Sequence, residues 1–112
     1  MVATQLGWVG FAADIYGKDL HQVDEIQDRI ELSTLYRSDP NLFAQRIQSA
    51  VAYVKTMDMV DADNVAVVGY CFGGTGVLQY AFLGLNGVQA IVSVHGGLLQ
   101  VPEASESINP KV

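Results

Sequence analysis

The fold of this chain is decided by the stretch Val65-Ala66-Val67-Val68-Gly69-Tyr70-Cys71-Phe72-Gly73-Gly74-Thr75-Gly76. In it, a nearly continuous apolar run leads directly into the pattern G-x-C-x-G-G. Unbroken apolar runs are typical of strands that are covered on both faces, as in a parallel sheet between helices. Apolar residues at helical spacing follow from Val77 to Leu85, and the segment Gly84–Gly87 closes them. The stretch therefore predicts a buried strand, a tight turn and a helix.

Strand-like runs also occur on either side of this stretch. They cover Trp8–Asp14 and Ala90–His95, and together with Asn64–Tyr70 they make three predicted strands. The segments between them carry helical periodicity, so the series predicts an α/β fold with a parallel sheet flanked by helices. Three such strands leave two apolar sheet edges without a partner, which stable proteins avoid. We therefore expect residues 1–112 to form a partial domain, with about three strands of a larger sheet.

The predicted helices differ in the strength of their signals. Apolar residues recur at three- and four-residue steps over 39–57, and Asp39 and Pro40 are the residue types that favour a helix start. A weaker pattern predicts a helix over 24–35. The first residues resemble the last turn of a helix, and at Asn109–Val112 another strand could begin. Both ends indicate that the sequence is part of a longer protein.

Composition excludes several classes of protein. Half of the 112 residues are hydrophobic and 16% are charged, which is too apolar for a disordered chain. The formal net charge of −6 repels phosphate backbones, so we expect no nucleic-acid partner. No apolar run is long enough to span a membrane, and no secretory signal is present, so we expect a cytoplasmic protein. A single cysteine excludes an internal disulfide and a Cys-rich zinc site.

The one cysteine stands where a nucleophile is expected. A strand, a tight turn and a helix form the context of a nucleophile elbow, with Cys71 in the place where serine is more common. Gly69 and Gly73 are expected to keep side chains out of the crowded turn, and Gly74 is a third glycine of the elbow. The dipole of the following helix favours the thiolate form, which is the attacking species. The backbone N–H of Phe72 is then placed to donate to an oxyanion.

Two other interpretations compete for the same residues. A lone cysteine is usually a small buried hydrophobe. A glycine-rich turn after a strand is also typical of nucleotide-binding loops, although neither G-x-G-x-x-G nor G-K-[ST] occurs here. The strand–turn–helix context favours the catalytic interpretation of Cys71.

Three segments resemble one family. Gly69–Thr75 resembles the elbow of the dienelactone hydrolase family of α/β-hydrolases. Phe11–Gly17 and Val92–Leu98 resemble the ends of that family's strands before and after the elbow. The resemblance covers most of residues 7–99 and implies an α/β-hydrolase type of fold. It also implies hydrolysis of ester or lactone bonds in a small-molecule substrate, through a Cys–His–Asp triad and without a cofactor or metal.

Only part of the family's site transfers to this sequence. Cys71 matches the nucleophile and the Phe72 N–H matches one oxyanion donor, whereas the family's triad Asp and His follow two later strands that have no counterpart here. Arg29 stands at about the right distance before Cys71 to match the arginine that holds a substrate carboxylate, although a solvated helix charge is the more common role. The isolated chain is therefore expected to have negligible esterase activity.

Two further residues are candidates for lining a pocket. His95 ends the strand next to the elbow strand, where it could approach Cys71 and act as a base or shape the pocket. Tyr70 is a second candidate, although tyrosine near a strand end is ordinarily packing. If the chain is not catalytic, the alternative is a truncated α/β domain that acts as a binding or oligomerisation module. Its exposed sheet edges would then allow self-association.

Overall fold

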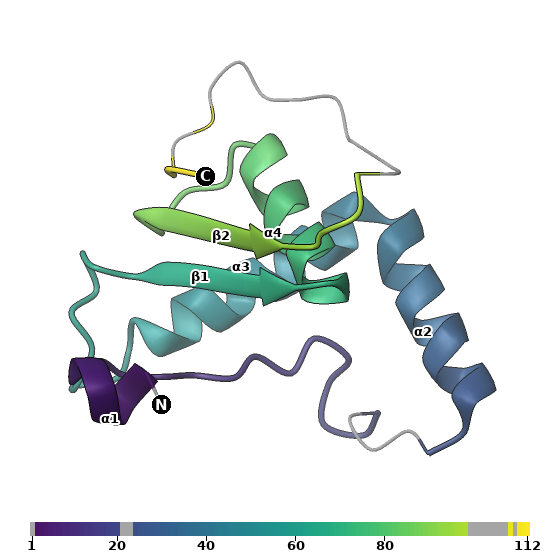
Figure 1. The fold of residues 1–112 in the computed structure, drawn as a ribbon, viewed down its shortest axis with the longest axis horizontal. Helices are drawn as coiled ribbons and strands as arrows, with labels where there is room; N and C mark the ends of the chain where they lie inside the picture. Colours follow the sequence, from purple (N-terminus) through teal and green to yellow (C-terminus); the bar gives the residue numbers. More distant parts are fainter. Residues whose placement is uncertain (1, 21–23, 99–107, 109) are drawn as a thin grey trace.

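The computed structural model describes residues 2–20, 24–98, 108 and 110–112. A short parallel sheet lies beside a set of helices (Figure 1). The elements in chain order are α1 (Val2–Leu6), α2 (Ile26–Ser38), α3 (Pro40–Val54), β1 (Ala66–Tyr70), α4 (Phe72–Phe82) and β2 (Ala90–Val94). None of these helices is long and apolar enough to cross a membrane, in the part of the chain that the structure describes.

The sheet consists of β1 and β2, which run parallel with Ala66 opposite Ala90 and Tyr70 opposite Val94. Helix α4 connects the two strands and packs against both of them, and α3 packs on α4. The strand–helix–strand order and the parallel pairing confirm the predicted α/β class. The predictions at Asn64–Tyr70 and Ala90–His95 are confirmed to within two residues.

The hydrophobic core lies between α3 and α4. On α3 the buried positions are spaced by one, three and four residues, which is the spacing of one helix face. The ring of Phe43 packs directly on the backbone of α4, because a Cβ at Gly76 would lie 2.5 Å from that ring. The core residues are Tyr36, Phe43, Ala44, Ile47, Val51, Val77, Tyr80, Ala81, Val88 and Ile91.

The start of α3 confirms the predicted helix signal. Asp39 is its N-cap, and the Leu42 N–H donates to Asp39 Oδ1 at 2.9 Å. Pro40 is the first helical residue, where the missing N–H costs no hydrogen bond. The weaker helix predicted over 24–35 is also present as α2. That helix is held by its carboxyl end, since Tyr36 is its one buried side chain while Ile26 is 72% exposed.

The first predicted strand, Trp8–Asp14, was wrong. Within the described residues no backbone hydrogen bond joins this segment to β1, and Trp8 is 64% exposed. A strand exists only when its N–H and C=O groups pair with a neighbour, so β-favouring residues are insufficient without a partner edge. The described contact of this segment with α3 is made by Phe11, whose ring centroid lies 5.9 Å from that of Tyr53.

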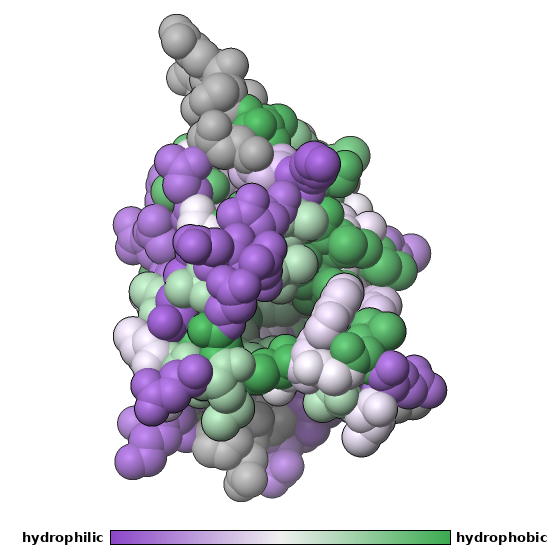
Figure 2. Space-filling model, turned by 90° about the vertical axis from the view of Figure 1, so that its left-hand side faces the viewer, coloured by the Kyte–Doolittle hydropathy of each residue, from purple (hydrophilic) through white to green (hydrophobic). Residues whose placement is uncertain are grey.

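The expectation that both faces of the sheet are covered was also wrong for the described residues. Val67 and Ile91 face α4, whereas the alternate positions face away from it and are exposed. The exposed positions are Val68, Tyr70, Val92 and Val94. Apolar side chains also reach the surface between polar ones on the side from which the strands begin (Figure 2). Within the described residues, the helices cover one face of the sheet and leave the other exposed.

An isolated β-bridge lies beside β2. The Ile91 N–H donates to the Lys111 carbonyl at 2.7 Å, and the Lys111 N–H donates to the Gln89 carbonyl at 3.1 Å. These two bonds form a parallel bridge between Ala90 and Lys111. Near Asn109–Val112, where the sequence suggests that another strand could begin, the described residues form this one bridge at Lys111, on the edge of β2 that β1 does not occupy.

Candidate active site at the turn between β1 and α4

The chain reverses direction at a single residue, Cys71. Its N–H donates to the Val94 carbonyl at 2.9 Å and so continues the sheet, while its carbonyl accepts from the Thr75 N–H at 3.1 Å and so begins the helix. Joining the two in one residue requires φ 50° and ψ −109°. A positive φ is unfavourable for a residue with a side chain and is typical of functional sites. The Cys71 side chain is exposed at this bend.

The glycines around Cys71 have different roles. A Cβ at Gly69 would lie 2.2 Å from the Gly73 carbonyl oxygen, and a Cβ at Gly74 would lie 2.9 Å from the Gly96 Cα. Both distances are shorter than real Cβ contacts, so the predicted steric need is confirmed for Gly69, and Gly74 has the same need although it was not predicted. For Gly73 it was wrong, because nothing lies within 4 Å of a Cβ built there. Gly73 contributes the carbonyl that Gly69 must accommodate, and its own side-chain position faces open space.

The turn is braced against the segment that follows β2. Ser93 Oγ donates to the Gly74 carbonyl at 3.1 Å. Thr75 Oγ1 accepts from the Gly97 N–H at 2.9 Å and donates to the Cys71 carbonyl at 3.4 Å. These bonds fix the first turn of α4 relative to the end of β2, and therefore fix the position of Cys71 relative to the sheet.

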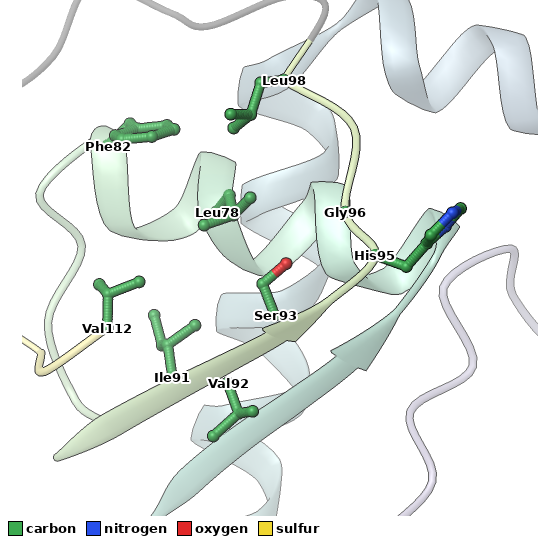
Figure 3. A pocket seen from close by; sticks show the side chains of 9 residues that line it. All are labelled: Leu78, Phe82, Ile91, Val92, Ser93, His95, Gly96, Leu98 and Val112. Atoms are coloured by element: carbon green, nitrogen blue, oxygen red, sulfur yellow. The ribbon is translucent and has the colours of Figure 1, made fainter.

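His95 follows β2 and has φ 60°, which is a second strained position at the same end of the sheet. It is exposed and forms no hydrogen bond with Cys71, both being described residues. It does line an open groove of about 570 Å³ between α4 and β2. In Figure 3 its ring points away from the apolar side chains of that groove. The structure thus gives His95 a place at a groove and no direct contact with the thiol.

The groove itself is mostly apolar. Leu78 and Phe82 of α4 face Ile91 of β2 across it (Figure 3). The remaining lining residues are Val92, Ser93, His95, Gly96, Leu98 and Val112. Cys71 does not line this groove, so the groove lies beside the strained turn and the sulfur does not face into it.

The other two candidate residues do not line the groove. Tyr70 is 68% exposed on the face of the sheet opposite α4 and does not line the groove. Arg29 lies in the first half of α2 and is exposed. The arginine of α2 that contacts the turn is Arg37, whose Cζ lies 5.4 Å from the centre of the Phe72 ring.

The side chain that follows Cys71 is the centre of an aromatic cluster that sequence analysis missed. The Phe72 ring stacks on Phe43 at a centroid distance of 4.5 Å and lies 5.5 Å from Tyr16 and 6.4 Å from Tyr36. Burial raises the pKa of Tyr16, and the positive charge of Arg37 opposes this effect. The sequence shows aromatic residues in several separate segments, but it does not show that their side chains contact one another in the fold. Among the described residues, no group of three or more His, Cys, Asp or Glu side chains could hold a metal ion.

The parallel strands joined through α4, with helices packed beside them, form part of an α/β-hydrolase type of fold. Comparison with known families gives a more specific assignment. Residues 2–112 match the model of the dienelactone hydrolase family, and the chain belongs to that family.

One relative among curated proteins gives a partial match. It is "Uncharacterized protein K02A2.1" of Caenorhabditis elegans, and it is 30% identical over 56 residues. The aligned segment covers 50% of the present chain and 35% of that protein, so the chain spans only part of the relative's length. No solved structure gave a significant match.

Proposed function

We propose that this chain carries the nucleophile of a hydrolase that cleaves carboxylic ester or lactone bonds in a small molecule, and that Cys71 is that nucleophile. The observation that carries the proposal is an exposed cysteine at a strained bend between the end of a parallel strand and the first residue of a helix. Membership of the dienelactone hydrolase family supports the reaction class. The strained φ supports a functional role, because a buried structural cysteine has no need of it.

The proposed reaction proceeds in two steps. The Cys71 thiolate attacks the carbonyl carbon, a C–S bond forms, and the carbonyl electron pair moves to oxygen, where the Phe72 N–H donates to it. The intermediate then expels the alcohol oxygen, which takes a proton, and leaves a thioester on Cys71. Water hydrolyses the thioester, which releases the carboxylic acid and restores the thiol. As the first residue of α4, Phe72 has no carbonyl within the helix to accept from its N–H, so that group is free for this role.

The second step needs a general base, and the described residues place none beside the sulfur. His95 makes no hydrogen bond with Cys71. Asp14 accepts from the Gly17 N–H at 3.0 Å within its own loop. We therefore propose that the 112-residue chain is acylated once and is deacylated slowly.

Release of nitrophenolate from p-nitrophenyl acetate tests the proposal. We expect a burst of about one equivalent per chain, followed by slow turnover, and no burst from Cys71→Ala. Ser49→Ala serves as a matched control, because it removes an exposed hydroxyl of α3 whose hydrogen bond lies within its own helix. Sustained turnover that Cys71→Ala leaves unchanged would exclude Cys71 as the nucleophile. Sustained turnover that both Cys71→Ala and His95→Ala abolish would instead assign the base to His95.

We also propose that the chain self-associates through the outer edge of β1. In the described residues β1 pairs only with β2, and the adjoining face carries the exposed side chains of Val68 and Tyr70. A strand edge of this kind is a template for pairing with another chain. Sedimentation over a range of concentrations is expected to show a dimer that Val68→Lys weakens. A monomer at every concentration would contradict the proposal.

A further inference from the structure

The peptide that joins Cys71 to Phe72, at the start of α4, is held in two ways: its carbonyl accepts from the N–H and the Oγ1 of Thr75, and the Phe72 side chain packs on its neighbours. Cys71 is the N-cap residue of this helix, but its side chain makes no capping hydrogen bond. The Phe72 ring, in contrast, contacts side chains from three other parts of the chain: Tyr16 in the loop before α2, Tyr36 and Arg37 in α2, and Phe43 in α3. The direction of the Phe72 N–H therefore depends in part on how firmly these neighbours hold the ring, beside the hydrogen bonds to the Cys71 carbonyl.

Arg37 differs from the other neighbours because its contact depends on charge. Its guanidinium lies over the ring, with Cζ 5.4 Å from the ring centre, which is within the range of a cation–π interaction. Within the described residues it forms no ion pair with a carboxylate, and it is half-buried. Phe43 and Tyr36 are core residues, whereas Arg37 can be replaced without removing an apolar side chain from the core.

We propose that Arg37 is a positioning residue: through the Phe72 ring, it holds the Phe72 N–H in the orientation that stabilises the oxyanion formed at Cys71. The proposal rests on the proposed function of Cys71. Arg37 touches neither the sulfur nor the substrate in this account. Its effect is confined to reactions that develop negative charge on a carbonyl oxygen.

Two reagents separate that effect from any change in the thiol itself. p-Nitrophenyl acetate acylates Cys71 through an oxyanion, whereas iodoacetamide alkylates it by displacing iodide and forms no oxyanion. The ratio of the two second-order rate constants, measured at one pH, therefore reports oxyanion stabilisation. We expect Arg37→Met to lower this ratio about two- to fivefold, from the lower end of the usual strength of a cation–π contact. Arg37→Lys keeps the charge and is expected to retain most of the ratio.

Two controls complete the experiment. Arg46→Met removes an exposed arginine of α3 and is expected to leave the ratio unchanged. Circular dichroism verifies that each variant is folded, and Arg37→Gln provides a second neutral variant. An unchanged ratio in both neutral variants, or an equal fall in acylation and alkylation, would overturn the role of Arg37. A wild-type ratio no higher than that of free cysteine would instead overturn the proposed function of Cys71, and the role of Arg37 with it.

Discussion

Replacing Gly69 with alanine tests the packing of the turn more sharply than any other single change. The added Cβ would lie 2.2 Å from the Gly73 carbonyl oxygen and 2.7 Å from the Gly74 nitrogen. These are backbone atoms, so no side-chain rotation relieves the overlap, and the oxygen must move until it is at least 3.0 Å away. Moving it displaces the first turn of α4 relative to β1, because Gly73 belongs to that turn and Gly69 belongs to the strand.

The expected cost lies at the upper end of the range for overpacking, about 3 kcal/mol in the free energy of unfolding. For a domain of this size, that loss lowers the midpoint of thermal unfolding by roughly 12 to 24 °C. The matched control is Gly73→Ala, four residues further on. Nothing lies within 4 Å of its Cβ, and alanine is favoured over glycine in a helix, so we expect a gain of about 0.5 to 1 kcal/mol.

Thermal and urea unfolding followed by far-ultraviolet circular dichroism measures both variants. The reasoning predicts that the two substitutions change stability in opposite directions. It is refuted if the free energy of unfolding of Gly69→Ala lies within about 0.5 kcal/mol of the wild-type value, which is the size of an ordinary surface effect. It is equally refuted if Gly73→Ala is as destabilising as Gly69→Ala, because the two glycines would then share one steric role.

Two further predictions concern stability. Asp39→Ala removes the acceptor for the Leu42 N–H and is expected to lower the free energy of unfolding in urea by about 1 kcal/mol. Asp39→Asn keeps an acceptor and is expected to retain most of that free energy, so equal losses in both variants would contradict a capping role. Burial raises the pKa of Tyr80 in the folded chain above its unfolded value near 10. The contribution of Tyr80 to the free energy of unfolding is therefore constant below about pH 10 and is lost as the pH rises through the folded pKa. Between pH 8 and pH 11, the midpoint of thermal unfolding is expected to fall less steeply for Tyr80→Phe, which also loses the hydrogen bond to the Asn86 carbonyl, than for the wild type. Midpoints that fall equally with pH in both proteins would contradict this.

Local signals were sufficient to predict most of the elements. The apolar run before Gly69 predicts β1 and the helical spacing after Gly76 predicts α4, because each element that packs on a core needs apolar residues of its own pattern. Asp39 and Pro40 predict the start of α3 for the same reason, since capping is settled by neighbouring residues. The turn at Cys71 also follows from local signals, and its φ of 50° places the strain at the predicted residue.

What sequence analysis missed depends on partners that are distant along the chain. Trp8–Asp14 has the composition of a strand, but no described strand pairs with it. Arg37 resembles any charged residue near a helix end, and its position over the Phe72 ring is set by how α2 meets α4. The requirement for Gly69 and the freedom of Gly73 likewise depend on which backbone atoms meet across the turn, which spacing alone does not show.

The central claim is that the Cys71 sulfur accepts an acyl group from an ester, and locating that group tests it most directly. After brief exposure to p-nitrophenyl acetate, the chain is digested and the modified residue is identified by mass spectrometry. The account predicts one acetyl group, held on Cys71 as a thioester and removed by hydroxylamine. Acetyl groups found on lysine or serine residues, with Cys71 unmodified, would contradict it.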